Sequence, residues 1–155
     1  DGTAASEAKL YPVSQLVEQA KEWKSKQTLV MLDVCFAGEN RVVYQKDKRP
    51  LVPVDMSDIE ASNKCVVLTA SDANQTANEL PEAKHGLFTY FLLKALKDDG
   101  DRDGNGWVTL RELYEYVHEN VSNEVAERLL AEQEPTIMPQ NVEQSEAGWR
   151  IGKSR

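Results

Sequence analysis

Two continuous apolar runs constrain the fold of this chain more than any other feature. Residues 28–34 read Thr-Leu-Val-Met-Leu-Asp-Val, and residues 64–70 read Lys-Cys-Val-Val-Leu-Thr-Ala. Neither run alternates apolar with polar residues, which is typical of strands buried on both faces in a parallel sheet. The sequence therefore predicts a sheet whose two faces are both covered.

Helical patterns flank the two runs. Before the first run, Leu16, Ala20 and Trp23 share one helical face, with Ser14 as the expected N-cap. After the second run and Gly86 comes an apolar stripe at helical spacing, which comprises Phe88, Phe91, Leu92, Ala95 and Leu96. These patterns predict one helix before the first strand and one after the second.

A third helix is expected from about Leu110, and Trp149–Ile151 is a candidate for a last strand. The third helix would bury Leu113, Val117 and Val121. The polar stretch 39–63 is expected to be an exposed loop, since its prolines Pro50 and Pro53 interrupt any ladder. The order of elements predicts an α/β layered domain.

Composition narrows the class of protein. The 155 residues fit one domain, and no apolar stretch approaches the ~20 residues that a membrane span needs. The formal net charge of −8 argues against a nucleic-acid partner and is compatible with cationic substrates. The two cysteines lie in apolar runs without disulfide spacing, which favours a reducing, cytoplasmic compartment. The first Met is Met31, so the chain is expected to be trimmed upstream.

Cys35 follows the first predicted strand and precedes Ala37 and Gly38. Open α/β sheets bind ligands beyond the carboxyl ends of their strands, and small residues there let a substrate backbone approach. A free Cys is also often a buried small hydrophobe, so both interpretations of Cys35 stay open on this segment alone. Cys65, inside a run of strand character, is expected to lie in the core.

Three segments in order resemble one family. The segment Asp33-Val-Cys35-Phe-Ala-Gly38 resembles the nucleophile segment of metacaspases and bacterial caspase-like peptidases, which read Asp-x-Cys followed by a short residue and Gly. Residues 70–79 and the Gly86-Leu-Phe-Thr89 helix are similar to segments that follow it in those enzymes. Phe36, where metacaspases commonly carry His, favours the bacterial caspase-like branch. The resemblance implies a caspase-like three-layer sandwich with a mostly parallel central sheet, residues 1–155 being the C-terminal portion of a domain incomplete at its N-terminus.

The resemblance also implies roles for individual residues. Cys35 would attack the scissile carbonyl as a thiolate, and its backbone N–H would be one oxyanion donor. Asp33 would line the S1 pocket, with Ala70 and Ser71 as the opposite wall, so that the partner is a peptide or protein with Arg or Lys at P1. The alternative for Asp33 is a side chain that caps the adjacent loop. No cofactor is required for this hydrolysis.

A cysteine peptidase also needs a base, which in caspases is a His about 50 residues before the Cys. Only 34 residues precede Cys35, and none is His. His85 belongs to the Gly-x-Phe-Thr segment, and His118 is expected on the surface of the third helix. We therefore expect the base on an upstream segment or separate chain, without which this chain is an incomplete peptidase.

Residues Asp101–Glu112 fit the twelve-residue EF-hand loop, with oxygens at positions one, three, five, nine and twelve and Gly106 at position six. The alternative is a tight turn without an ion, in which Thr109 caps the next helix. EF-hands normally pair, and no second loop is present, so calcium stays a candidate and no metal ligand is assigned. Two functions remain open: a cysteine endopeptidase, or a catalytically inactive caspase-like module that binds partners or calcium and regulates another protein.

Overall fold

A computed structural model of the chain describes residues 13–34, 64–72, 75, 77–78, 85–139 and 148–154, and the backbone of three two-residue strands at 36–37, 52–53 and 79–80. Within these residues, no helix combines the length and the apolar character that crossing a membrane requires. The expectations for Cys35 and for most of the 39–63 stretch lie outside the described residues.

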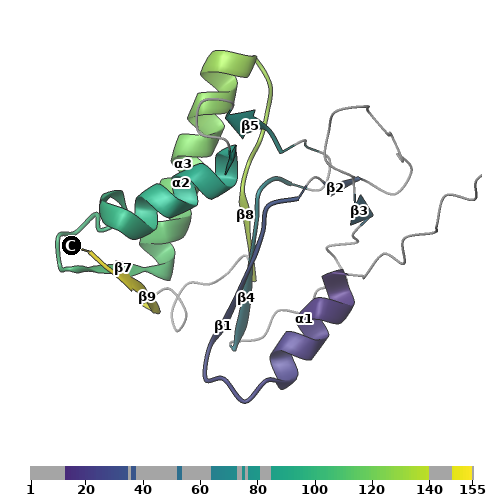
Figure 1. Cartoon of the computed structure of the whole chain (residues 1–155), viewed down its shortest axis with the longest axis vertical. Helices are drawn as coiled ribbons and strands as arrows, with labels where there is room; N and C mark the ends of the chain where they lie inside the picture. The colour runs from purple at the N-terminus through teal and green to yellow at the C-terminus, as the bar shows by residue number, and fades with distance from the viewer. Residues whose placement is uncertain are drawn as a thin grey trace, which may run out of the picture.

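The two apolar runs form neighbouring parallel strands, as expected. Strand β1 (Thr28–Leu32) pairs with β4 (Cys65–Thr69), in register from Thr28 opposite Cys65 to Leu32 opposite Thr69. On the other side of β4 lies β8 (Thr136–Met138), which is antiparallel (Figure 1). The described sheet, in the order β1-β4-β8, is therefore mixed, and the antiparallel β8 departs from the mostly parallel sheet that was expected.

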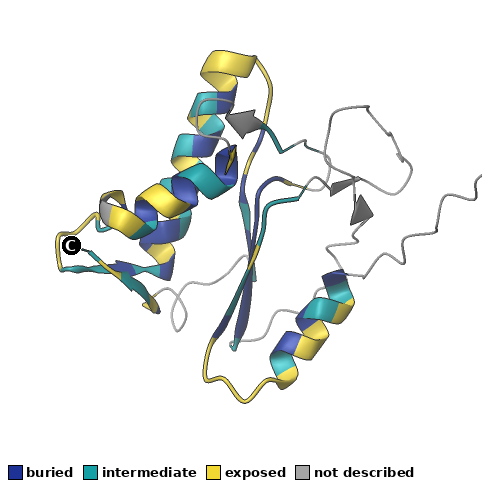
Figure 2. Cartoon of the chain, viewed as in Figure 1, coloured by how far each residue is buried: buried dark blue, intermediate teal, exposed yellow. Residues whose placement is uncertain are grey.

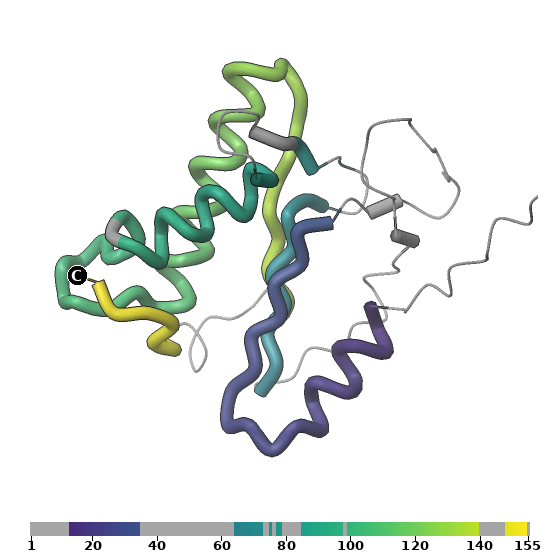
Figure 3. Tube along the Cα trace, in the orientation of Figure 1, coloured from purple at the N-terminus to yellow at the C-terminus, as the bar shows by residue number. Residues whose placement is uncertain are grey.

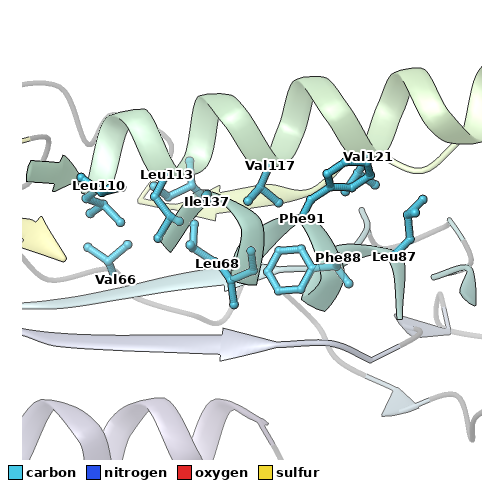
Figure 4. Packing of buried hydrophobic residues seen from close by; sticks show 14 of the residues in the cluster. Val66, Leu68, Leu87, Phe88, Phe91, Leu110, Leu113, Val117, Val121 and Ile137 are labelled. Carbon is cyan, nitrogen blue, oxygen red and sulfur yellow. The ribbon is translucent and has the colours of Figure 1, made fainter. Parts of the chain in front are cut away.

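Strand β4 separates two hydrophobic cores. Val66, Leu68 and the following Ala70 face a large core built with α2 and α3 (Figure 4), while Cys65 and Val67 face a smaller core built with α1. Every residue of β4 is buried, so the prediction of a strand covered on both faces is confirmed (Figure 2). Cys65 is 1% exposed, as expected of a core residue.

Strand β1 is less buried than its sequence predicts. Thr28 is buried, but Met31 is 41% exposed. Among the described residues, β1 has a sheet neighbour on one side only, namely β4. A strand with one neighbour leaves part of its side chains uncovered, which explains the difference.

Helix α1 (Val13–Glu22) covers one face of the sheet through Val13, Val17 and Ala20. Of the predicted face, Ala20 is buried as expected, but Leu16 is only partly buried, and Trp23 lies beyond the helix and is 52% exposed. Ser14 lies inside the helix and is not its N-cap.

The opposite face is covered by α2 (Leu87–Lys94), its π-helical continuation η2 (Ala95–Asp99), and α3 (Leu110–Leu129). Gly86 is the N-cap of α2, and the expected stripe is buried, except that Leu96 is partly exposed. Helix α3 starts at Leu110 and buries the predicted side chains, with Thr109 as N-cap of a capping box closed by Glu112. The described part of the chain is thus an α/β/α arrangement of three layers (Figure 1).

Short strands complete the structure in three pairs. The strands β2 (Phe36–Ala37) and β3 (Val52–Pro53) are parallel, so the expectation that Pro53 excludes pairing was wrong. A proline carbonyl can still accept a hydrogen bond at an edge. The pairs β5 (Glu79–Leu80) with β6 (His85–Gly86) and β7 (Trp107–Thr109) with β9 (Arg150–Lys153) are antiparallel. Strand β9 begins one residue after the strand that was predicted at Trp149–Ile151 and ends two residues after it.

Candidate active site

The residues just before Cys35 and those just after β4 lie at the same edge of the sheet. Because β1 and β4 are parallel and in register, Asp33 and Ala70 follow their last paired residues side by side (Figure 3). The Ala70 N–H donates to the Leu32 carbonyl at 2.9 Å, which extends this pairing. Such an edge is where α/β sheets bind ligands.

The start of α2 reaches this edge and contacts Asp33. The Thr89 hydroxyl donates a hydrogen bond to Oδ2 of Asp33, 56 residues earlier in the chain. A Cβ atom built on Gly86 would lie 2.9 Å from Cγ of Asp33, so only glycine lets the carboxylate approach the backbone there. We call Asp33, Ala70, Ser71, Gly86 and Thr89 the carboxyl edge. All three segments of the family resemblance contribute to it.

Ala70 and Ser71 are fully buried. The Ser71 hydroxyl donates to the Gln75 carbonyl at 3.3 Å, and the Ser71 carbonyl accepts from the Thr69 hydroxyl at 3.0 Å. Ser71 is therefore held by its own loop and shapes the wall of this edge, without an exposed hydroxyl.

Gln133 is part of this region and was not predicted. Its side chain is 1% exposed; Nε2 donates to the Ala70 carbonyl at 2.8 Å, and Oε1 accepts from the backbone N–H of Asn78 at 2.8 Å. The Ser122 hydroxyl donates to its carbonyl at 3.2 Å. No sequence signal marks it, since a glutamine between two glutamates and before Pro135 has the pattern of an exposed loop.

The catalytic candidate Cys35 lies outside the described residues, two positions beyond Asp33. The two histidines lie in different places. His85 is exposed and directly precedes Gly86. His118 is half-buried on α3, with its ring 5.5 Å from that of Tyr114, so it is less exposed than expected.

The loop from Asp101 to Glu112 folds around one carboxylate. Glu112 accepts four hydrogen bonds: from the backbone N–H of Arg102 at 3.1 Å and of Asp103 at 3.3 Å, and from the N–H and hydroxyl of Thr109 at 2.9 and 2.7 Å. Burial alone would raise the pKa of Glu112, but these hydrogen bonds together lower it below its ordinary value.

The same loop gathers three acidic side chains. Carboxylate oxygens of Asp101, Asp103 and Glu112 lie within 4.8 Å of one another, so this group could hold a metal ion. Gly104 and Gly106 have φ of 72° and 86°, the left-handed conformation that favours glycine. Strand β7 of this loop pairs with β9.

No protein-family model, curated protein sequence or solved structure matches this chain.

Proposed function

We propose that this chain is the part of a caspase-like cysteine endopeptidase that supplies the nucleophile Cys35 and the pocket for a basic P1 residue. The observation that carries the proposal is the carboxyl edge itself. Three segments far apart in the sequence, each resembling the caspase-like family, meet at the end of the strand that leads into Cys35.

The chemistry follows from these positions. A thiolate at Cys35 adds to the scissile carbonyl, the amine leaves, and water hydrolyses the thioester. Asp33 pairs with the guanidinium or ammonium group of a P1 Arg or Lys. Thr89 and Gly86 support this role because they fix the direction of the Asp33 carboxylate from the α2 side.

In this proposal, the base that holds Cys35 as thiolate is neither His85 nor His118 but a histidine on an upstream segment or a second chain. If so, replacing His85 or His118 by Ala in the full-length protein leaves kcat within about twofold. A loss of more than about 100-fold in His85→Ala, the scale of general-base catalysis, would instead make His85 the base.

Fluorogenic peptides with Arg, Lys, Asp or an uncharged residue at P1 test the specificity of the full-length protein. We expect cleavage after Arg and Lys, and none in Cys35→Ala. Asp33→Asn and Thr89→Val should lower kcat/KM for Arg peptides by about 10- to 100-fold, because a hydrogen bond to a charged group contributes about 1.5–3 kcal/mol. Both variants should change kcat/KM for peptides with an uncharged P1 residue far less.

Ser25→Ala is a matched control. Its hydroxyl pairs with that of Thr28 at 2.6 Å, at the opposite end of β1 from Asp33. This variant should leave unchanged the ratio of kcat/KM for Arg peptides to kcat/KM for uncharged peptides, which we call the Arg-to-uncharged ratio. Cleavage after Asp, or activity that survives Cys35→Ala, contradicts the proposed function.

A second candidate function is a catalytically inactive, calcium-binding caspase-like module. The cluster of Asp101, Asp103 and Glu112 favours it. Calcium would have to replace the four hydrogen bonds to Glu112, so we expect weak binding. Calorimetric titration with Ca²⁺, with Asp103→Asn as the weakened variant, separates an ion site from a turn, since the turn alone gives no heat of binding.

A further inference from the structure

We propose that Gln133 is a positioning residue that sets the separation between the two sides of the S1 pocket, which receives the P1 residue. This inference rests on the proposed function and adds to it a residue of the C-terminal tail. It concerns a glutamine 98 positions after Cys35 that is not part of any segment of the family resemblance.

The first link joins Gln133 to the wall after β4. Its Nε2 donates to the carbonyl of Ala70 at 2.8 Å, at the point where β4 has ended and the loop begins. Ala70 is fully buried, and it directly follows Thr69, the last residue of β4 that pairs with β1. The glutamine amide thus holds the wall formed by Ala70 and Ser71.

The second link joins Gln133 to the other side. Its Oε1 accepts from both the backbone N–H and the side-chain amide of Asn78, at 2.8 and 3.0 Å. The Asn78 carbonyl accepts in turn from the N–H of Leu87 at 2.9 Å. Leu87 directly follows Gly86, whose backbone contacts the carboxylate of Asp33.

One side chain therefore connects Ala70 on one side of Asp33 with the start of α2 on the other. A buried amide without partners would be costly, so these hydrogen bonds define one position for Gln133 and hence one spacing of the two sides. A displacement of about 1 Å at a substrate-orienting group can cost about 100-fold in rate, so that this spacing matters for catalysis.

Gln133→Met and Gln133→Glu test the two links in the full-length protein. Met keeps the length and removes both links, whereas Glu keeps an acceptor for Asn78 and loses the donor to Ala70. With Arg peptides, kcat/KM should fall at least about tenfold in both variants, through KM more than kcat, because in Gln133→Glu a buried carboxylate oxygen faces the Ala70 carbonyl. The ratio of kcat/KM for Arg peptides to that for uncharged peptides should fall in both. If one variant fails to fold, the other provides the test.

Asn120→Ala is the control for a purely structural effect. Its side-chain amide donates to the Tyr116 carbonyl at 2.8 Å on α3. The loss of this hydrogen bond should lower thermal stability without changing the Arg-to-uncharged ratio. If Gln133→Met lowers stability but leaves the ratio within twofold of wild type, the positioning role is refuted.

Amide hydrogen exchange tests the hydrogen bonds of Gln133 independently of enzymatic activity. Exchange at Asn78 and Leu87 should accelerate at least about tenfold in Gln133→Met, and unchanged exchange refutes the link. A wild-type protein that cleaves none of the peptides overturns the proposed function, and with it the role of Gln133 in specificity, whatever the exchange shows.

Discussion

Replacing Glu112 by Gln tests whether one carboxylate holds the loop between η2 and α3. In the wild type, one oxygen accepts from the N–H groups of Arg102 and Asp103, and the other accepts from the N–H and hydroxyl of Thr109. Glutamine has a single carbonyl oxygen, so its NH₂ group must face one of these two pairs of donors. Two hydrogen bonds to a charged group are lost, each worth about 1.5–3 kcal/mol. Taking the lower value, we expect the free energy of unfolding at pH 7 to fall by about 3 kcal/mol.

The loss should depend on pH in a defined direction. The folded state lowers the pKa of Glu112, so its carboxylate stabilises the fold at neutral pH, and this contribution disappears as the pH falls through the folded pKa. The difference between wild type and Glu112→Gln is therefore largest near neutral pH and shrinks in acid.

Urea unfolding at pH 7 and at a series of acidic pH values measures this difference. Glu115→Gln is the matched control, since Glu115 lies on the same helix and makes exposed ion pairs with Arg102 and Arg111, at 3.9 and 3.7 Å. Such pairs contribute about 0–1 kcal/mol. Equal losses in the two variants, or a Glu112→Gln loss that is the same at every pH, would refute the reasoning.

Three further changes concern stability elsewhere. Gly86→Ala brings a methyl group against the Asp33 carboxylate, and thermal unfolding should show a loss of about 2 kcal/mol; an unchanged Tm contradicts the contact. Leu130→Gly should stabilise the protein by about 1 kcal/mol in urea unfolding, because Leu130 has φ of 49° and is 91% exposed, and a destabilised variant would speak against this. Lys64→Met removes an ammonium that donates to the carbonyls of Lys21, in the last turn of α1, and Trp23, just beyond it. This loss should cost about 1 kcal/mol and accelerate amide exchange in α1, and unaltered exchange there contradicts it.

The elements with strong local patterns could be predicted from the sequence. Strand β4 is buried on both faces, which leaves a continuous apolar run, and α3 has both a capping box at Thr109 and a regular apolar stripe. Strand β8 has only three residues between Pro135 and Pro139, too few for a period to show. The buried face of α1 was predicted only at Ala20, because the prediction also relied on Trp23, the largest apolar side chain nearby, which lies past the helix end.

The candidate site divides in the same way. Asp33, Ala70 and Ser71 could be proposed from the family resemblance alone. The register of β1 and β4 then brings the positions after the two strands together. The partners of Asp33 could not be predicted, since the contact with Thr89 depends on how α2 packs on the sheet. Gln133 could not be found either, because its burial is decided by residues from three other parts of the chain.

The arrangement of β4 between its neighbours has a consequence for the order of folding. Helices α2 and α3 are consecutive and share one core, so their contacts close short segments of chain. The parallel pair β1–β4 instead joins residues as far apart as Thr28 and Cys65, which requires a longer loop to close. The pair β4–β8 joins residues still farther apart, such as Val67 and Met138. We therefore expect the α2–α3 unit to form before the sheet. The carboxyl edge would then be completed late, since Asp33 directly follows a strand of the sheet and Thr89 belongs to the early helix.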